Sequence, residues 1–466
     1  MLRIFERKIC GDGIIYTYND LQKITGEREK MQFIYAVISE HESSQIYRNG
    51  AVSGLFYRGS DPDLEAIKKV VYDREGNAHI DTVSPNHKLT SNLYHLFINQ
   101  LVSYELGNGV SFNNPEIKKA LGGAEFDYIL QQILIYAAND GEAYGLVTDD
   151  GIIPLCCACK VNGDEPLFIP LKDEDDGEVK SGIRYWRLAE DKPLRVTLYE
   201  ADGWTEYKEA EDGNLQIYRE KMPYRVRRIS NKIEGEIGIV SQKSGDFPIV
   251  FMKFINNQSS IVGNRAKLFA YDVVLSGMVN CVDMNTVYWT LRNAEGMSPQ
   301  DDLNLVADMI YRRIIHTPED VEVKKEEIST NHKAFSDVLG VLRQQLFTDF
   351  QAVDTESVSS RNVTTVEIKA AYENLNLKCD EIERYIASFI RGCLKVKGFD
   401  QNEPFHFKRP NNINELEYVT KIAGISAQIG DETALKLICE ALGLIDEYEK
   451  ILEKKEAQDM ENFGLE

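Results

Sequence analysis

Three cysteines lie close together in the sequence, at Cys156, Cys157 and Cys159, and thiols at this spacing could bind a metal or form disulfides. Cys156 and Cys159 have the C-x2-C spacing of zinc ligands, but no second such pair and no nearby histidine completes a tetrahedral set. If this segment is a strand, Cys156 and Cys159 also point to opposite faces. Most of the other cysteines are scattered in apolar contexts. We therefore expect buried, reduced thiols and no metal site.

Two charged clusters could also bind ligands. Asp173-Glu-Asp-Asp-Gly177 is rich enough in carboxylates to suggest a calcium loop, but it lacks the third carboxylate spacing and the terminal glutamate of an EF-hand. We interpret it as a solvated hairpin tip. Arg225-Val-Arg-Arg228 alternates like an exposed strand and could be a phosphate-binding patch or simply solvated. The seven histidines show no ligand spacing.

Sequence motifs of common enzymes are missing. The chain has no G-x-x-x-x-G-K-[ST] or G-x-G-x-x-G phosphate loop, no G-x-S-x-G elbow and no H-E-x-x-H pair. Acid–base catalysis needs positioned carboxylates, and the sequence singles none out. We therefore expect a structural protein with no catalytic residues and no cofactor. The alternative from another class is a metal-dependent nuclease in the strand-rich region 143–256, with Asp149, Asp150 and Glu165 as its candidate acidic residues.

Composition and charge limit the class of protein further. With 466 residues, of which 43% are hydrophobic and 27% charged, the chain can bury sizeable cores, and its length suggests about three domains. No apolar run is long enough to span a membrane, and the segment Met1 to Cys10 lacks the apolar region of a signal peptide, so we expect the protein to stay in the compartment where it is made. The net charge of −22 is unexpected for a protein that grips phosphates. It would let DNA slide past without adhering, or it simply keeps the protein soluble.

The element that could position a functional loop is a long helix between Thr364 and Gly398. Apolar residues recur there at alternating steps of four and three, which is the pattern of a helix packed along one seam. Thr364 and Glu367 form a capping box, and Gly398 is a natural C-cap. The polar segment 351–362 precedes this helix. It is either a mobile loop presented to a neighbour or into a channel, or an ordinary surface loop before a core helix. The apolar seam consists of Ile368, Tyr372, Leu375, Cys379, Ile382, Ile386, Phe389 and Cys393.

Other patterns predict mixed helices and strands before and after this segment. A helical face in 86–112 includes Leu93, Leu96, Phe97, Leu101 and Tyr104, together with the polar Gln100. The further expected elements are helices at 28–47, 125–139, 260–292 and 331–350, a compact insert at 298–328, helices after 411, and strands at 143–147, 152–155, 183–188, 194–199, 204–207, 245–251 and 405–409.

Several sequence segments, taken in order, resemble the portal proteins of tailed double-stranded DNA phages of the long-tailed, siphophage type. The resemblance covers roughly residues 85–455, whereas the first 85 residues match no segment typical of the family. In the loop, Ser359-Ser-Arg-Asn-Val363 departs from the Gly-rich phrase usual in the family. The sequence segments that carry the resemblance are Asn92–Phe112, Gly245–Asn257, Ser357–Thr365, Asn414–Gly424 and Asp431–Leu435.

The resemblance implies an α+β portal fold that assembles as a ring, typically of twelve subunits, around a central channel. It implies a mixed α/β wing, a helical stem, a small α/β clip and a helical crown. The implied divisions are the N-terminal part of the wing at 1–256, stem helices at 257–292 and 331–350, the clip at 293–330, the tunnel loop at 351–362, the long wing helix with its returning strand at 363–410, and the crown at 411–466.

The resemblance also implies where partners would bind. Double-stranded DNA would pass the loop residues during packaging and ejection, and the clip would dock the terminase large subunit and the head–tail adaptor. The major capsid or scaffolding protein would surround the ring at the portal vertex of the virion, after assembly in the host cytoplasm. No membrane is involved. Another head–tail adaptor or minor capsid protein is the alternative within phage proteins. The implied loop residues are Gln351, Asp354, Thr355, Glu356, Ser357, Ser359, Ser360, Arg361 and Asn362, and the implied clip residues are Arg292, Arg312, Arg313, Lys324 and Lys325.

Two of these roles have alternatives. Arg361 could contact a DNA phosphate transiently, or it could form a salt bridge with an acidic residue of the adjacent subunit. The clip cations could dock a partner or be solvated.

Overall fold

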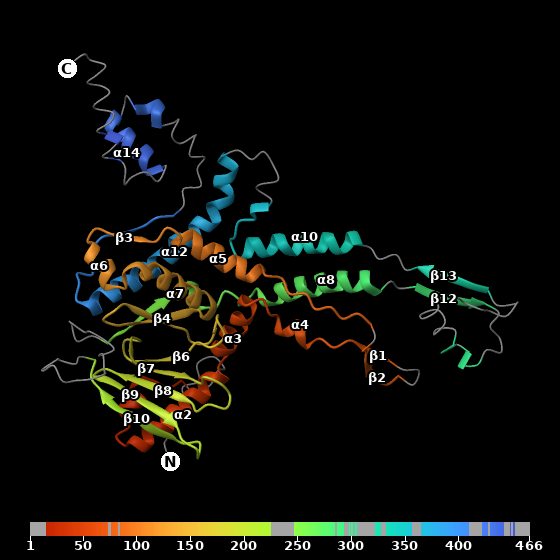
Figure 1. The fold of residues 1–466 in the computed structure, drawn as a ribbon, viewed down its shortest axis with the longest axis horizontal. Coiled ribbons are helices and arrows are strands. Elements are labelled where there is room, and N and C mark those ends of the chain that lie inside the picture. The colour runs from red at the N-terminus through yellow and green to blue at the C-terminus, as the bar shows by residue number, and fades with distance from the viewer. Residues whose placement is uncertain are drawn as a thin grey trace. The chain divides into compact units, whose positions relative to one another are not determined.

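The computed structural model divides the chain into two compact units. The large unit consists of Met1–Arg58, Leu93–Gly263 and Phe347–Glu466, and the small unit consists of Gly59–Asn92 and Asn264–Leu346 (Figure 1). The structure describes residues 15–72, 76–82, 84–224, 247–284, 287–292, 298, 300–301, 303–304, 322–327, 332–356, 365–409, 422–426, 429–441, 448 and 451–452.

Helices of the large unit begin and end where the sequence offers caps. Thr17 forms a capping box with Asp20 at the start of α1, and Ser44 separates α2 from α3 because its side chain accepts a hydrogen bond from the Tyr47 amide. The expected helix at 28–47 is therefore two helices. Gly141 ends α7 in the left-handed conformation (φ 92°). The described helices are α1 (Tyr18–Gln22), α2 (Glu27–Ser43), α3 (Gln45–Tyr57), α5 (Leu93–Leu106), α6 (Pro115–Ala120), α7 (Phe126–Asp140), α12 (Thr365–Lys397) and α14 (Asp431–Ala441), with short 3-10 turns at Gly123–Glu125 and Ile255–Asn257.

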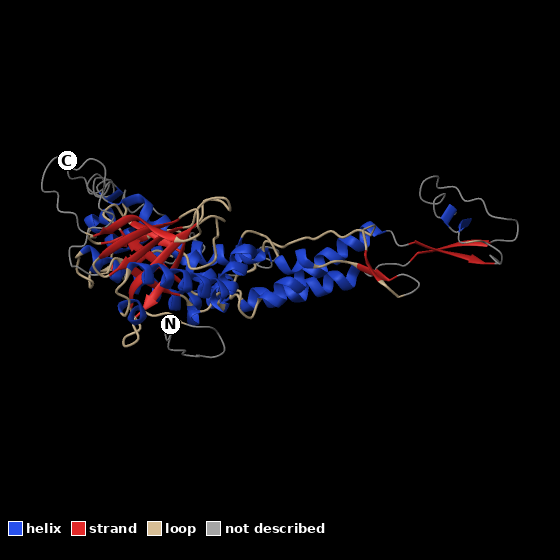
Figure 2. Ribbon diagram, turned by 90° about the horizontal axis from the view of Figure 1, so that it is seen from below, coloured by secondary structure: helices blue, strands red, loops and turns tan. Residues whose placement is uncertain are grey.

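Antiparallel sheets make up the rest of the large unit. A five-stranded sheet has the order β10-β9-β8-β7-β6, and a three-stranded sheet has the order β11-β4-β5. Figure 2 shows these strands in red beside the helices. A small ribbon pairs β14 with β3, so that Phe405 lies opposite Phe112. The strands are β3 (Val110–Phe112), β4 (Glu142–Val147), β5 (Ile152–Leu155), β6 (Leu167–Lys172), β7 (Val179–Trp186), β8 (Arg195–Glu200), β9 (Gly203–Glu209), β10 (Leu215–Met222), β11 (Ile249–Lys253) and β14 (Phe405–Phe407).

Helix α12 lies directly on the three-stranded sheet because two glycines allow a close approach. A Cβ atom on Gly145 in β4 would lie 2.7 Å from the Phe389 ring, and one on Gly392 in α12 would lie 2.5 Å from Val250 in β11. The predicted seam of α12 is confirmed from Leu375 to Cys393, where its residues are almost fully buried, whereas Tyr372 is half-buried. Gly398 is also confirmed as the C-cap, with φ 75°.

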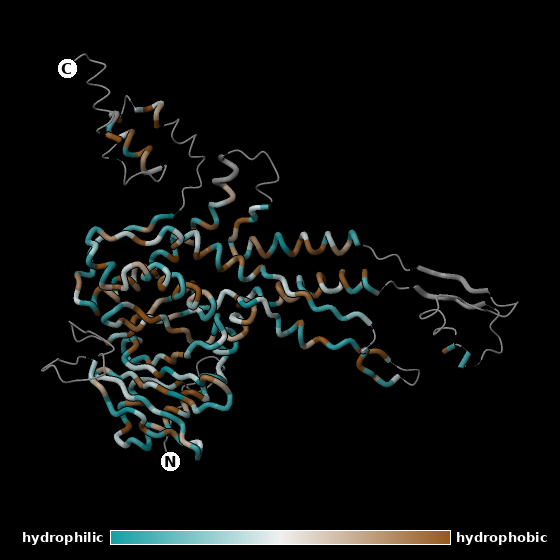
Figure 3. The backbone as a smooth tube through the Cα atoms, in the orientation of Figure 1, coloured by the Kyte–Doolittle hydropathy of each residue, from teal (hydrophilic) through white to brown (hydrophobic). Residues whose placement is uncertain are grey.

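The small unit is built around a helical hairpin and an extended segment. Helices α8 (Arg265–Met284) and α10 (His332–Asp349) lie side by side, and both alternate between polar and apolar residues along their length (Figures 1 and 3). The last three residues of α10 belong to the large unit. The remaining described elements are α4 (Pro62–Ala66) and the two-stranded pairs β1 (Val70–Tyr72) with β2 (Ala78–Ile80) and β12 (Val287–Arg292) with β13 (Glu322–Glu327).

One face of α8 holds the extended segment 84–92 through a ladder of hydrogen bonds. Asp272, Ser276 and Asn280 are four residues apart on α8, and they accept the amides of Ser91, Leu89 and His87 at 2.8, 2.9 and 2.7 Å. Two residues of an extended chain rise by nearly the same length as four residues of a helix. Every second residue of the segment therefore lies beside every fourth residue of α8. Residues 59–92 therefore belong to the same compact unit as α8.

The sequence pattern predicts a helix that continues to Arg292, and this is wrong. Helix α8 ends at Met284, and strand β12 follows over Val287–Arg292. The physical reason is the run Thr286-Val-Tyr-Trp-Thr290, because β-branched and aromatic residues favour strands over helices.

Candidate functional site

The site that the structure defines best is the base of loop 351–362, where α10 ends. The amide of Gln351 donates to the Thr348 carbonyl (3.1 Å), and the amide of Ala352 donates to the Phe347 carbonyl (2.9 Å). This is a Schellman arrangement, in which the residue after the C-cap is left-handed. Gln351 takes that conformation (φ 52°), although glycine is the usual residue there. The chain therefore leaves the helix in one sharp turn.

Gln100 in α5 holds the next part of the loop by its backbone. Its side-chain oxygen accepts the Val353 amide, and its side-chain nitrogen donates to the Val353 carbonyl, both at 2.9 Å. The Gln100 side chain thus makes the pair of backbone hydrogen bonds that a neighbouring strand would make. Its partner, Val353, is only 4% exposed. The sequence offered one signal for this role, because Gln100 is the polar residue on an otherwise apolar helical face.

An aromatic cluster packs against the end of α10 from the same side. The Phe350 ring stacks on Phe97 with ring centroids 4.5 Å apart, and it meets Tyr94 edge-on at 5.8 Å. Phe347 meets Phe97 edge-on at 5.0 Å. Such aromatic pairs stabilise a contact beyond the area that they bury. They fix the loop base to α5.

Lys378 in α12 makes the third attachment. Its ammonium group donates to the Phe350 carbonyl at 2.7 Å. A cation at a helix C-terminus is stabilised by the carbonyls that have no partner within the helix. Burial lowers the pKa of Lys378 to about 8, so the amine is mostly charged at neutral pH. Helix α5, helix α12 and the last residues of α10 therefore meet at the loop base.

The polar part of the loop starts after this anchor. The Asp354 side chain accepts the Glu356 amide (3.2 Å), and Thr355 and Glu356 are exposed. Of the expected loop residues, Gln351, Asp354, Thr355 and Glu356 are described. Ser357, Ser359, Ser360, Arg361 and Asn362 lie outside the described residues, as does the expected cap Thr364.

The predicted burial of the three clustered cysteines is confirmed, since Cys156, Cys157 and Cys159 are at most 1% exposed. Asp140 holds their segment, because its carboxylate accepts the amides of Cys157 (2.8 Å) and Ala158 (3.1 Å). Burial raises the pKa of Asp140 to about 7.

The acidic cluster also has its predicted place, at the turn between β6 and β7. Lys180 binds Asp173 at 2.8 Å and Asp176 at 2.7 Å. The cluster is thus a charged hairpin tip in this structure. The segment Arg225–Arg228 lies outside the described residues.

In the structure, the acidic residues of the nuclease alternative make other contacts. Asp149 and Asp150 lie in the turn between β4 and β5, where the Asp149 carbonyl accepts a hydrogen bond from Lys397 (2.9 Å). Glu165 accepts the Asn162 amide (2.7 Å). Within the described residues, no group of three histidine, cysteine or carboxylate side chains could hold a metal ion.

Comparison with known proteins shows to which family the chain belongs. The family model of SPP1 Gp6-like phage portal proteins matches residues 37–398, a span that runs from α2 through the loop base to the end of α12. The chain belongs to this portal protein family. The expected resemblance is therefore confirmed.

Two relatives of the chain are named portal proteins. The portal protein of Bacillus phage SPP1 is 23% identical over 386 residues, which cover 77% of this chain and 70% of the relative. The portal protein of Clostridium phage phiCD119 is 22% identical over 482 residues, which cover 93% of this chain and 99% of the relative. Among solved structures, the neck of a native GTA particle, computed with C12 symmetry, is similar with a TM-score of 0.41 and 9% identity over 78% of this chain and 92% of that chain.

The cations expected to dock partners of the portal protein lie partly on the β12–β13 hairpin. Arg292 pairs in register with Glu322, and Lys324 and Lys325 lie opposite Thr290 and Trp289. Arg312 and Arg313 lie outside the described residues. No helix in the described parts of the chain is both long and apolar enough to cross a membrane.

Proposed function

We propose that this portal protein forms a ring, with about twelve copies as its expected size, at one capsid vertex, and that double-stranded DNA is packaged and ejected through the channel of that ring. The order of elements supports the proposal: a long helix, an inserted hairpin, a second long helix, a polar loop and a third long helix. In this account α8 and α10 are stem helices, 293–330 is the clip, 351–362 is the tunnel loop and 411–466 is the crown. The wing consists of 1–256 and 363–410.

The observation that carries the proposal is the sharp boundary at the loop base. Up to Val353 the backbone is held by Gln100, by Lys378 and by stacked aromatic rings. From Thr355 the sequence is polar and lacks large apolar side chains except Val358. A loop that starts from a fixed base on two long helices can reach into a channel while its base stays in place.

Charge would keep DNA from adhering to the channel. Each copy has a net charge of −22, which is repeated around a ring. Exposed charges act over about one Debye length, roughly 8 Å at physiological salt, so phosphates are repelled near the wall. Arg361 is an exception within the loop, and its role is either a transient phosphate contact or an ion pair with the adjacent subunit.

The clip would be the docking surface for other components of the virion. Arg292, Arg312, Arg313, Lys324 and Lys325 would contact the terminase large subunit during packaging and the head–tail adaptor afterwards. The portal protein would assemble in the host cytoplasm with the capsid or scaffolding protein. In this account it has no catalytic residues and needs no cofactor.

A shortened loop tests the channel assignment. Deleting 355–360 removes the polar segment but keeps Val353 and its two hydrogen bonds to Gln100. We expect such a protein to assemble normally, while phage that carry it package or retain less DNA, as counted from filled and empty capsids by electron microscopy. A deletion that prevents assembly would contradict the assignment, because the loop would then join subunits.

A further inference from the structure

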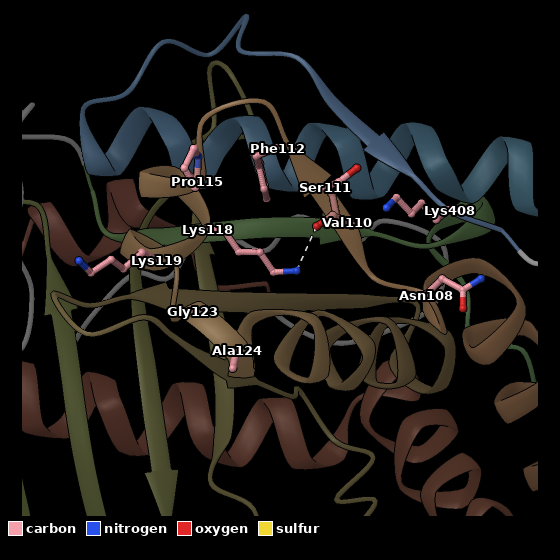
Figure 4. A pocket seen from close by; sticks show the side chains of 10 residues that line it. All are labelled: Asn108, Val110, Ser111, Phe112, Pro115, Lys118, Lys119, Gly123, Ala124 and Lys408. Atoms are coloured by element: carbon pink, nitrogen blue, oxygen red, sulfur yellow. Dashed lines mark hydrogen bonds between the residues drawn. The ribbon is translucent and has the colours of Figure 1, made fainter. Parts of the chain in front are cut away.

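A cavity of about 510 Å³ opens on the large unit beside the β3–β14 ribbon. Its apolar lining comes from Val110, Phe112 and Pro115, and its charged lining comes from Lys118, Lys119 and Lys408. Figure 4 shows Lys118 in the middle of the site, with Lys119 and Lys408 on either side of it. Among the residues that line the cavity there is no carboxylate. We call this site the lysine pocket.

The walls of the lysine pocket are held rigidly. Strand β14 pairs with β3, and Arg409, the next residue after Lys408, binds three carboxylates. Its partners are Glu105 at 2.7 Å, Asp380 at 2.5 Å and Glu383 at 2.6 Å. Several charged hydrogen bonds on one guanidinium fix the chain on both sides of this position. Lys408 is therefore held at the rim of the pocket by its neighbour.

The positive charge of the pocket is only partly neutralised. Lys118 binds Asp127 at 2.5 Å and donates to the Val110 carbonyl at 3.2 Å. Lys119 and Lys408 are exposed, and neither has a carboxylate partner among the residues that the structure describes. The pocket is thus a site for an anionic group beside an apolar wall.

The ring of the proposed function suggests what could fill it. Identical subunits with a net charge of −22 repel one another, so a stable contact needs a place where opposite charges meet. A closed ring is built from heterologous contacts, in which one patch of each subunit meets a different patch of the next. An acidic projection on a second patch of the neighbouring subunit would complement the cationic pocket.

The turn at Asp173–Gly177 has the matching chemistry. Its four consecutive acidic residues form the longest acidic run in the sequence. Lys180 neutralises Asp173 and Asp176. Glu174 accepts a hydrogen bond from the Thr17 hydroxyl (2.9 Å), and Asp175 is exposed and without a cation partner among the described residues. Glu174 and Asp175 thus remain available to a cation of another molecule.

We propose that the acidic turn Asp173–Gly177 of one subunit docks into the lysine pocket of the next subunit in the ring. This inference rests on the proposed ring. Nucleic acid is a weaker candidate for the pocket, because sequence-independent binding to phosphates needs an extended basic surface and grows with the number of contacts. Three lysines at one concave site suit a short acidic turn better.

Charge reversal with rescue tests the contact. The variant Lys119→Glu/Lys408→Glu should raise the concentration at which half of the subunits are in rings by roughly tenfold, because each interface loses two attractions and gains repulsion. Glu174→Lys/Asp175→Lys should have a similar effect. The combined fourfold variant should assemble within about twofold of the unmodified protein, since the charges are exchanged. Mass photometry at low salt measures the ring fraction.

Two comparisons make the outcome decisive. Lys192→Glu/Lys436→Glu changes the net charge equally at two exposed lysines of the same unit and should assemble normally, and circular dichroism should show every variant folded. If the pocket variant assembles normally, or if the fourfold variant is not rescued, the acidic turn is not the occupant. If the unmodified protein forms no rings under any condition, the proposed ring itself is wrong and this contact is wrong with it.

Discussion

Gln100 and Val353 are 253 residues apart in the sequence, yet they exchange two hydrogen bonds of 2.9 Å each. This pair marks the point at which the chain changes from packed helix to polar loop. Gln100 comes from the early helix α5, so the base of the loop is held by a distant part of the same unit. In the proposed portal channel, that base remains fixed while the loop reaches beyond it.

Removing the Gln100 side chain should loosen the loop base. In Gln100→Ala the buried amide and carbonyl of Val353 lose their partners, and an unsatisfied buried polar group costs about 1–3 kcal/mol. Hydrogen exchange at the Val353 amide should become faster, and the midpoint of denaturant unfolding should fall. Gln132→Ala is the matched control, because Gln132 donates to the exposed hydroxyl of Tyr128. Unchanged exchange at Val353 would show that the pair does not hold the loop.

The lysine at the helix end should make stability depend on pH in the alkaline range. The pKa of Lys378 is lowered from 10.5 to about 8 by burial, so between these values the unfolded chain binds more protons than the folded one. Stability from this group therefore rises as the pH increases from about 8 to 10.5. Lys378→Met should abolish that rise. Denaturant unfolding of both proteins at several pH values measures the difference, and identical pH profiles would refute it.

The Arg409 cluster should be the most sensitive ionic site of the large unit. Glu105 is fully buried, and its pKa is raised to about 7 by burial even though Arg409 opposes the shift. Arg409→Ala leaves this carboxyl without its cation, and such a change typically costs about 3–5 kcal/mol. Arg384→Ala, at an exposed position of α12, should change the free energy of unfolding by less than about 0.5 kcal/mol. Equal effects of the two variants would contradict the buried role.

Two glycines should respond to alanine with opposite signs. Gly392→Ala places a methyl group 2.5 Å from Val250 and should destabilise the packing of α12 on the sheet by about 1–3 kcal/mol. Gly340→Ala in α10 meets no atom within 4 Å and should stabilise the helix by about 0.5–1 kcal/mol. Thermal unfolding of the two variants gives both signs in one experiment. A neutral Gly392→Ala would mean that α12 can move away from β11.

Local patterns in the sequence predict the long helices well. The seam of α12 repeats over many turns, and Gly398 marks its end, so neighbouring residues contain the whole signal. The end of α8 at Met284 is missed because helical spacing continues through residues whose type favours a strand. The turn at Gln351 is missed because glycine, not glutamine, is the usual residue in a left-handed position.

The loop base illustrates what a single sequence leaves open. Its location follows from the polar run after a helix, but the contacts that hold it come from residues far apart in the chain. Gln100 pairs with Val353, and Lys378 with Phe350, through the tertiary packing of three helices. The three carboxylates of Arg409 likewise meet only in the folded chain. No spacing rule along the sequence encodes such contacts.

Electron microscopy of the purified protein tests the central claim most directly. The account predicts rings with a central hole, and class averages should show about twelvefold symmetry. Measurement over a range of protein concentrations and salt would allow for weak assembly. A protein that remains monomeric throughout, including when it is co-expressed with its capsid and scaffolding proteins, would contradict the account of a ring that conducts DNA.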